Sequence, residues 1–233
     1  MHARSRPMRL AAISTPNIAL SENRAAIAIG DISGKGVGAA LLMSLTSSAV
    51  ESHGRELERP AEVLSSLNRL LAARLKANHM NAALMFVVFD PHARQLRVAN
   101  AGMIAPVLIT PAGSQFLDVC GLPIGSYIDA VYQDHSTGIN PGDTLLLVSD
   151  GVVEAHNQFG EMFGFERLTE LFDDMPQLDD VRALVELVLG QVQEFMGKAE
   201  QHDDITIVAV RPMLARDLVD IDTEGQSAAY AAL

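Results

Sequence analysis

Strand-forming segments in this chain come in runs, and the helix-forming segments are inserted between those runs in pairs. A doubly wound parallel sheet requires strands and helices to alternate along the chain, so this order counts against it. Runs of strands with short turns favour antiparallel pairing instead. The sequence therefore predicts an α+β fold, a sandwich of two antiparallel β-sheets flanked by helices.

Residue type and period place the individual elements. Segments rich in Val, Ile, Leu and Phe that are bounded by turn residues predict strands at 10–20, 25–30, 83–89, 95–99, 107–110, 115–119, 130–138, 144–148 and 205–210. Helices are predicted at 38–52, 60–76, 165–172 and 178–196. We predict a single domain over 8–213, with disordered tails at 1–7 and 214–233.

Composition excludes several classes of protein. The 233 residues are enough for one domain with a full core, or at most two small ones. A net charge of −12 argues against a nucleic-acid surface, which needs clustered basic residues. No apolar run reaches the roughly 18 residues that span a bilayer. The single cysteine, Cys120, forms no internal disulfide and is expected to be a small core residue. The simplest interpretation is a cytoplasmic bacterial-type protein without membrane insertion.

Three aspartates share one position relative to predicted strands. Asp31 comes directly after one apolar strand, Asp150 follows another with one residue between them, and Asp203 comes just before a third. Hard divalent cations such as Mg²⁺ and Mn²⁺ prefer oxygen ligands, typically a few carboxylates and water. Aspartates are also common in turns, and that interpretation is the stronger one for any of the three taken alone. Together they predict a metal site.

The glycine-rich segment around Asp31 has the sequence Gly-Asp-Ile-Ser-Gly-Lys-Gly over residues 30–36. A nucleotide-binding P-loop has four residues between its first glycine and the Gly-Lys pair, followed by Ser or Thr. Here three residues intervene, and Gly36 follows Lys35. The spacing therefore argues against a P-loop.

Six motifs in order along the chain resemble the bacterial stage II sporulation protein E-like branch of the metal-dependent (type 2C) serine/threonine protein phosphatases. Each motif is weak alone, but their order and spacing together are specific. The resemblance covers about residues 11–211. The motifs lie at 30–43, 100–106, 121–125, 143–154, 163–168 and 203–206.

The resemblance implies an αββα sandwich with a metal centre at one end. It implies that Asp31 bridges two cations, Mn²⁺ or Mg²⁺, and that the Ile32 carbonyl is a further ligand. Asp150 and Asp203 would complete the shell of the first metal. A metal-bound water or hydroxide would attack the phosphorus in line, without a phospho-enzyme intermediate.

Other residues of the matching motifs are expected to support the metal ligands or to contact the substrate: Ser33, Gly34, Lys35, Gly151 and Asp204. Lys35 could draw a phosphate towards the metals, although a solvated loop lysine is equally consistent with its position. The implied substrate is a phosphoserine or phosphothreonine of a protein, an anti-sigma-factor antagonist in bacterial partner switching. A separate regulatory protein is an expected second partner, and the chain could be a fragment of a longer sensor protein.

The sequence departs from the family pattern in two places. The family usually has two carboxylates on its first strand, and counting back from Asp31 without a gap places Ile13 and Pro16 there. Met103 stands where a histidine is usual in the central hairpin. Because metal affinity rises with ligand charge, the second cation is expected to bind weakly. The alternative function is a degenerate phosphatase fold that acts as a binding module, but three retained aspartates favour the enzyme.

Overall fold

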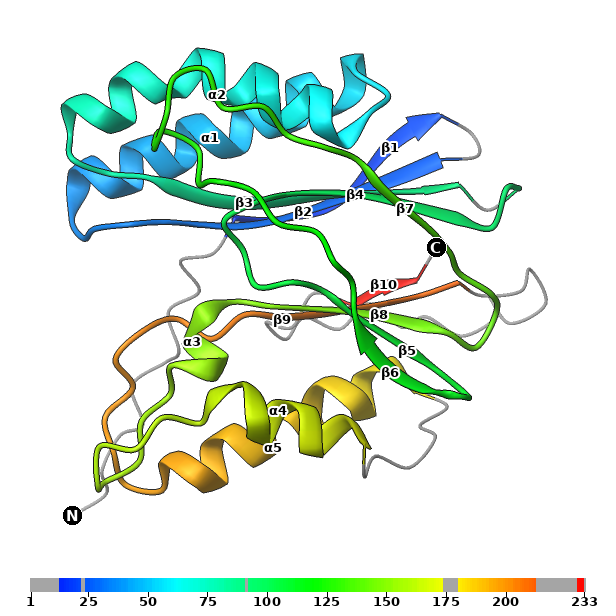
Figure 1. The fold of residues 1–233 in the computed structure, drawn as a ribbon. Helices are drawn as coiled ribbons and strands as arrows, with labels where there is room; N and C mark the ends of the chain where they lie inside the picture. Colours follow the sequence, from blue (N-terminus) through cyan, green and yellow to red (C-terminus); the bar gives the residue numbers. More distant parts are fainter. Residues whose placement is uncertain (1–12, 22–23, 91, 174–179, 213–229, 233) are drawn as a thin grey trace.

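Two five-stranded β-sheets face each other, and helices cover the outer face of each sheet (Figure 1). This arrangement comes from a computed structural model, which describes residues 13–21, 24–90, 92–173, 180–212 and 230–232. The α+β sandwich predicted from the sequence is confirmed. No helix in the described ranges is long and apolar enough to cross a membrane.

The first sheet is antiparallel throughout and has the strand order β1-β2-β3-β4-β7. Its strands are β1 (Ile13–Ser21), β2 (Arg24–Ile32), β3 (Ala82–Asp90), β4 (Gln95–Ala101) and β7 (His135–Gly138). Helices α1 (Val37–Glu56) and α2 (Pro60–Ala77) lie together across its outer face (Figure 1). Proline at the first position of α2 fits its fixed backbone angle and its missing N–H.

The second sheet has the order β10-β9-β8-β5-β6, and only the β10–β9 pair is parallel. Its strands are β5 (Val107–Thr110), β6 (Gly113–Phe116), β8 (Thr144–Val148), β9 (Ile207–Arg211) and β10 (Tyr230–Ala232). The short helix α3 (Asp150–Val153) follows β8 directly. Helices α4 (Gly164–Asp173) and α5 (Val181–Met196) cover the outer face of this sheet (Figure 1).

Three apolar cores join the four layers. Successive side chains of a strand point to opposite faces, and β2 shows the consequence. Ala26 and Ala28 belong to the core beneath α1 and α2, whereas Ile29 packs between the sheets with residues of β8 and β9. A third core fills the space between the second sheet and α4 and α5. The order is therefore αββα.

Two predicted strands are shorter than expected, for the same reason. The strand predicted at 115–119 ends at Phe116, yet Leu117 and Val119 are still buried, because they pack between the sheets. The strand predicted at 130–138 begins only at His135. Before it, Tyr132 packs in the core near the helices. Apolar residues in these segments reflect burial of a loop rather than a strand.

Two further expectations from the sequence concern the ends of the chain and the single cysteine. The predicted disordered tail at 1–7 and most of that at 214–233 lie outside the described residues, but Tyr230–Ala232 form β10 beside β9. The limits of a single domain at 8–213 stay a prediction. Cys120 is exposed, which corrects the expectation of a core residue. Burial alternates along this segment: Leu117 and Val119 are buried between the sheets, whereas Asp118 and Cys120 are exposed.

Candidate metal centre

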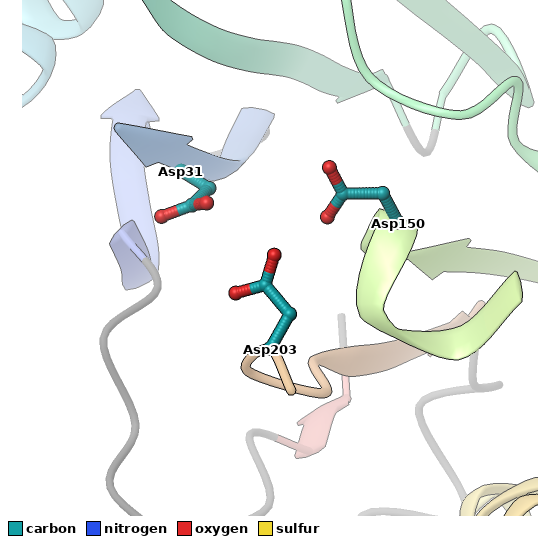
Figure 2. A group of neighbouring side chains, drawn as sticks. All are labelled: Asp31, Asp150 and Asp203. Atoms are coloured by element: carbon teal, nitrogen blue, oxygen red, sulfur yellow. The ribbon is translucent and has the colours of Figure 1, made fainter. Parts of the chain in front are cut away.

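The three predicted aspartates meet at one end of the sandwich. Asp31 lies near the end of β2, Asp150 begins α3 directly after β8, and Asp203 lies in the loop before β9. One carboxylate oxygen from each lies within 4.8 Å of the other two. Figure 2 shows the three carboxyl groups directed towards a common space from separate segments of the chain. The tertiary structure thus brings together residues that are far apart in sequence.

Each of the three aspartates makes the same local hydrogen bond. Its Oδ1 accepts the backbone N–H of the residue that follows it, at 2.7 Å for Asp31, 3.0 Å for Asp150 and 2.8 Å for Asp203. This bond orients the exposed carboxylates of Asp150 and Asp203 and the partly buried carboxylate of Asp31. The second oxygen takes no part in it. The arrangement therefore holds three carboxylates in place and keeps acceptor capacity for a ligand.

Charge at the site is poorly balanced without a cation. The pKa of Asp31 is raised from 3.8 to about 6, chiefly by burial and also by repulsion from Asp203, Asp150 and Asp204, against the lowering effect of the Ile32 N–H. Among the described residues, no lysine or arginine forms an ion pair with the three clustered carboxylates. Oxygen-only donors with unbalanced negative charge suit Mg²⁺ or Mn²⁺. The residues present fit such an ion.

A cavity of about 980 Å³ joins the aspartates to the glycine-rich loop and the start of α1. The loop is held by two bonds to Asn81 at the edge of β3: the Ser33 N–H donates to the Asn81 carbonyl at 2.9 Å, and the Asn81 N–H donates to the Ser33 Oγ at 2.8 Å. Gly34 and Gly36 have φ of 101° and 95°, which glycine adopts without strain. This loop presents Lys35, which is exposed, along the cavity wall.

Gly151 has a packing role that the sequence did not reveal. A Cβ at this position would lie 2.3 Å from the carbonyl oxygen of Asp204. The segment after β8 therefore approaches the segment before β9 too closely for any side chain. Gly151 and Asp204, predicted from the motifs as supporting residues, do lie together, and Asp204 lines the cavity beside Asp203. Asp204 therefore adds to the negative charge of the site.

The first strand supplies no carboxylate beside Asp31. Ile13 pairs with Gly30, the residue before Asp31, so β1 does run next to the site. The register is irregular between Thr15 and Ile18, where Pro16 has no N–H to donate to the ladder. The residues of β1 are Ile, Ser, Thr, Pro, Asn, Ile, Ala, Leu and Ser, none of them acidic.

Two residues near the site were missed by sequence reasoning. Ser149 is buried between the loops that carry Asp150 and Asp203, and Asn81 holds the glycine-rich loop. Ser149 could have been noticed because it directly precedes a predicted ligand. Asn81 lies outside every motif and gave no signal. Met103, at the position of the family's usual histidine, packs partly against the core between the sheets and is bonded through its backbone to Asn100.

Comparison with known proteins identifies the family and the fold. The chain is 29% identical to phosphoserine phosphatase RsbU of Bacillus subtilis over 189 residues, which is 79% of this chain and 55% of RsbU. It therefore spans about half the length of that relative. The SiaA-PP2C domain of Pseudomonas aeruginosa is 25% identical with a TM-score of 0.71, over 80% of this chain and 75% of the other.

A structure of the PP2C phosphatase domain of SpoIIE from Bacillus subtilis, with a fragment of its regulatory domain, shares the fold. Its TM-score is 0.71 at 18% identity, and the match covers 86% of this chain and 58% of that one. The profile of the family described as Stage II sporulation protein E (SpoIIE) matches residues 21–212. Fold, motif order and matched length agree, and the chain belongs to the stage II sporulation protein E family.

Proposed function

We propose that this chain is a metal-dependent phosphatase that hydrolyses phosphoserine or phosphothreonine on a protein substrate. The observation that carries the proposal is the convergence of Asp31, Asp150 and Asp203 within 4.8 Å in a fold shared with phosphatase domains. Fold alone would not be sufficient, since function depends on the residues of a site. Here the residues suit the chemistry as well.

In this proposal the three carboxylates and the Ile32 carbonyl hold the cation or cations. A cation held there supplies Lewis acidity, which activates water and offsets charge on the phosphoryl group. Lys35 lines the same cavity and draws the substrate phosphate towards the carboxylates, whose own charge would otherwise repel it. Asp204 and Gly151 keep the two ligand-bearing loops in contact.

Direct attack by water fits the lining of the cavity better than a covalent intermediate. Of the described residues that line it, Ser33 is the only hydroxyl, and its Oγ already accepts the Asn81 N–H. No histidine lines the cavity in the described part of the chain, so Ser33 lacks a neighbouring imidazole base. The nucleophile is therefore proposed to be water.

The metal content is proposed to be one firmly bound cation and a second, weaker one. Asp31, Asp150 and Asp203 provide three carboxylates for the first. The second would depend on Asp31, the Ile32 carbonyl and whatever β1 provides, and β1 contains no acidic residue. Fewer charged ligands give weaker binding of a hard cation. Either Mn²⁺ or Mg²⁺ meets the donor set.

The proposed substrate is a phosphorylated anti-sigma-factor antagonist in bacterial partner switching, and the proposed second partner is a regulatory protein. Both rest on the similarity to RsbU, whose name records action on phosphoserine, and the chain spans about half of that protein. A cytoplasmic location belongs to the same proposal and is consistent with a single, unpaired cysteine.

The missing carboxylates on β1 favour one alternative, a weak or inactive phosphatase fold that binds a protein partner. The two functions are separated by measuring hydrolysis of para-nitrophenyl phosphate and of a phosphoserine peptide across Mn²⁺ and Mg²⁺ titrations. Turnover that EDTA and Asp150→Asn both abolish would support the phosphatase. Folded protein without turnover at any metal concentration would exclude it and leave the binding module.

A further inference from the structure

Ser149 is a buried serine at the point where the two loops that carry Asp150 and Asp203 touch. Its exposed fraction is 4%, whereas the side chains of Asp150 and Asp203 are both exposed. An exposed aspartate is not held by packing, so its position depends on the backbone beneath it. The contacts of Ser149 therefore determine how the two ligand-bearing loops sit relative to each other.

The hydroxyl of Ser149 donates one hydrogen bond and accepts another. It donates to the Asp204 carbonyl at 3.0 Å and accepts the Thr206 backbone N–H at 2.9 Å. The backbone N–H of Ser149 also donates to the Thr206 carbonyl at 3.0 Å. A serine hydroxyl offers one donor and two acceptor positions, so this bridge uses its donor and one acceptor. Three hydrogen bonds thus join residue 149 to the segment that follows Asp203.

A second contact, on the other side of Asp150, also limits the spacing of the two ligand-bearing loops. Gly151 lies so close to the Asp204 carbonyl that a Cβ would stand 2.3 Å from that oxygen. Asp150 therefore lies between Ser149, which is hydrogen-bonded to the Asp204 carbonyl, and Gly151, which lies close against the same carbonyl. These two contacts limit the separation between Asp150 and Asp203.

We propose that Ser149 is a positioning residue, which sets the spacing of the Asp150 and Asp203 carboxylates and thereby the affinity of the site for a divalent cation. The inference rests on the metal centre of the proposed function and assigns Ser149 no contact with metal or substrate. Groups that orient metal ligands typically contribute about 10- to 100-fold to metal affinity. Loss of the hydroxyl would also remove this hydrogen-bond partner from the Asp204 carbonyl and from the buried Thr206 N–H.

Thr206 provides a matched control. It is 4% exposed and lies in the same contact, but its own hydroxyl has no hydrogen-bond partner among the described residues. Thr206→Val removes that hydroxyl with little change of shape. It tests whether loss of any buried hydroxyl at this junction is enough to weaken the site.

The test is Mn²⁺ binding by isothermal calorimetry to the full chain, with metal-free thermal unfolding measured in parallel. We expect Ser149→Ala to weaken binding about tenfold or more, Thr206→Val to bind as the wild type does, and Ser149→Thr, which keeps a hydroxyl, to recover most of the loss. Hydrolysis should then require more Mn²⁺ in Ser149→Ala, while kcat at saturating Mn²⁺ changes little.

Unchanged Mn²⁺ affinity in folded Ser149→Ala would overturn the inference, as would an equal loss in Thr206→Val. If Ser149→Ala does not fold, Ser149→Cys is used in its place. Mn²⁺ affinity of Ser149→Cys equal to that of the wild type would likewise overturn the inference. Wild-type protein that binds Mn²⁺ without hydrolysing phosphate would contradict the proposed function alone. Wild-type protein that binds no Mn²⁺ would contradict both.

Discussion

The backbone N–H of Ile32 donates a 2.7 Å hydrogen bond to the Oδ1 of Asp31, the residue before it. This bond stabilises the ionised carboxylate and lowers its pKa, yet burial and three neighbouring carboxylates together raise the pKa to about 6. Asp31 is thus held towards Asp150 and Asp203 (Figure 2) at a place where its charge is unfavourable. Such a conflict is common where function constrains a residue more than stability does.

Replacing Asp31 should therefore separate stability from function. Asp31→Asn removes a charge that is repelled by Asp150, Asp203 and Asp204. We expect metal-free protein to gain on the order of 1 kcal/mol, less than the full pKa shift implies because the group is partly open to solvent. Mn²⁺ binding and hydrolysis should be lost. Urea unfolding in EDTA and calorimetry measure the two effects, and Asp118→Asn, exposed and outside the cavity, is the control.

The stability of the metal-free chain should depend on pH through Asp31. Its pKa is raised in the folded protein from 3.8 to about 6, so folding favours the protonated form. That contribution is complete below about pH 4 and is lost as the pH rises through about 6. Thermal unfolding in EDTA from pH 4 to 7 should show this fall, and Asp31→Asn should lack it.

Mn²⁺ affinity should depend on pH in the opposite sense to the stability of the metal-free chain. A proton on Asp31 competes with the cation, so apparent Mn²⁺ affinity should decrease as the pH falls below about 6. Equal Mn²⁺ affinity at pH 5 and pH 7 would show that Asp31 is not a ligand.

Two glycine-to-alanine substitutions should have opposite effects. In Gly151→Ala the new Cβ would meet the Asp204 carbonyl at 2.3 Å, so the loops must separate. We expect a cost of about 1–3 kcal/mol and weaker Mn²⁺ binding. In Gly190→Ala, on the exposed face of α5, the Cβ meets nothing within 4 Å. That variant should gain about 0.5–1 kcal/mol in free energy of unfolding without a change in Mn²⁺ binding. Urea unfolding curves measure the stability of both variants, and calorimetry measures their Mn²⁺ binding.

Lys35 should affect the substrate more than the metal. It is exposed on the cavity wall, so Lys35→Gln should raise KM for a phosphoserine peptide by about tenfold, the effect of one charge-assisted hydrogen bond to phosphate. Mn²⁺ affinity should not fall. Steady-state kinetics at saturating Mn²⁺ provide the measurement, with Lys76→Gln, exposed and outside the lining of the cavity, as the control. An unchanged KM would favour the solvated loop lysine.

Local patterns predicted the elements whose residues follow a single period. The strands predicted at 107–110 and 144–148 have the bounds of β5 and β8, and the helix predicted at 60–76 differs from α2 by one residue. The aspartates Asp31, Asp150 and Asp203 could be chosen because each adjoins such a strand. Their roles as ligands stay predictions, but their proximity is now a structural fact.

The tertiary structure decides which residues are neighbours in space. Leu117 and Tyr132 are as apolar as strand residues, yet they are buried in loops, because the faces of two sheets and a helix pair cover them. Ser149 and Asp204 are 55 positions apart, and nothing in their local sequence indicates the bond between them. Periodicity records which face of an element is buried, but only the packing of the two sheets determines which loops meet at their ends.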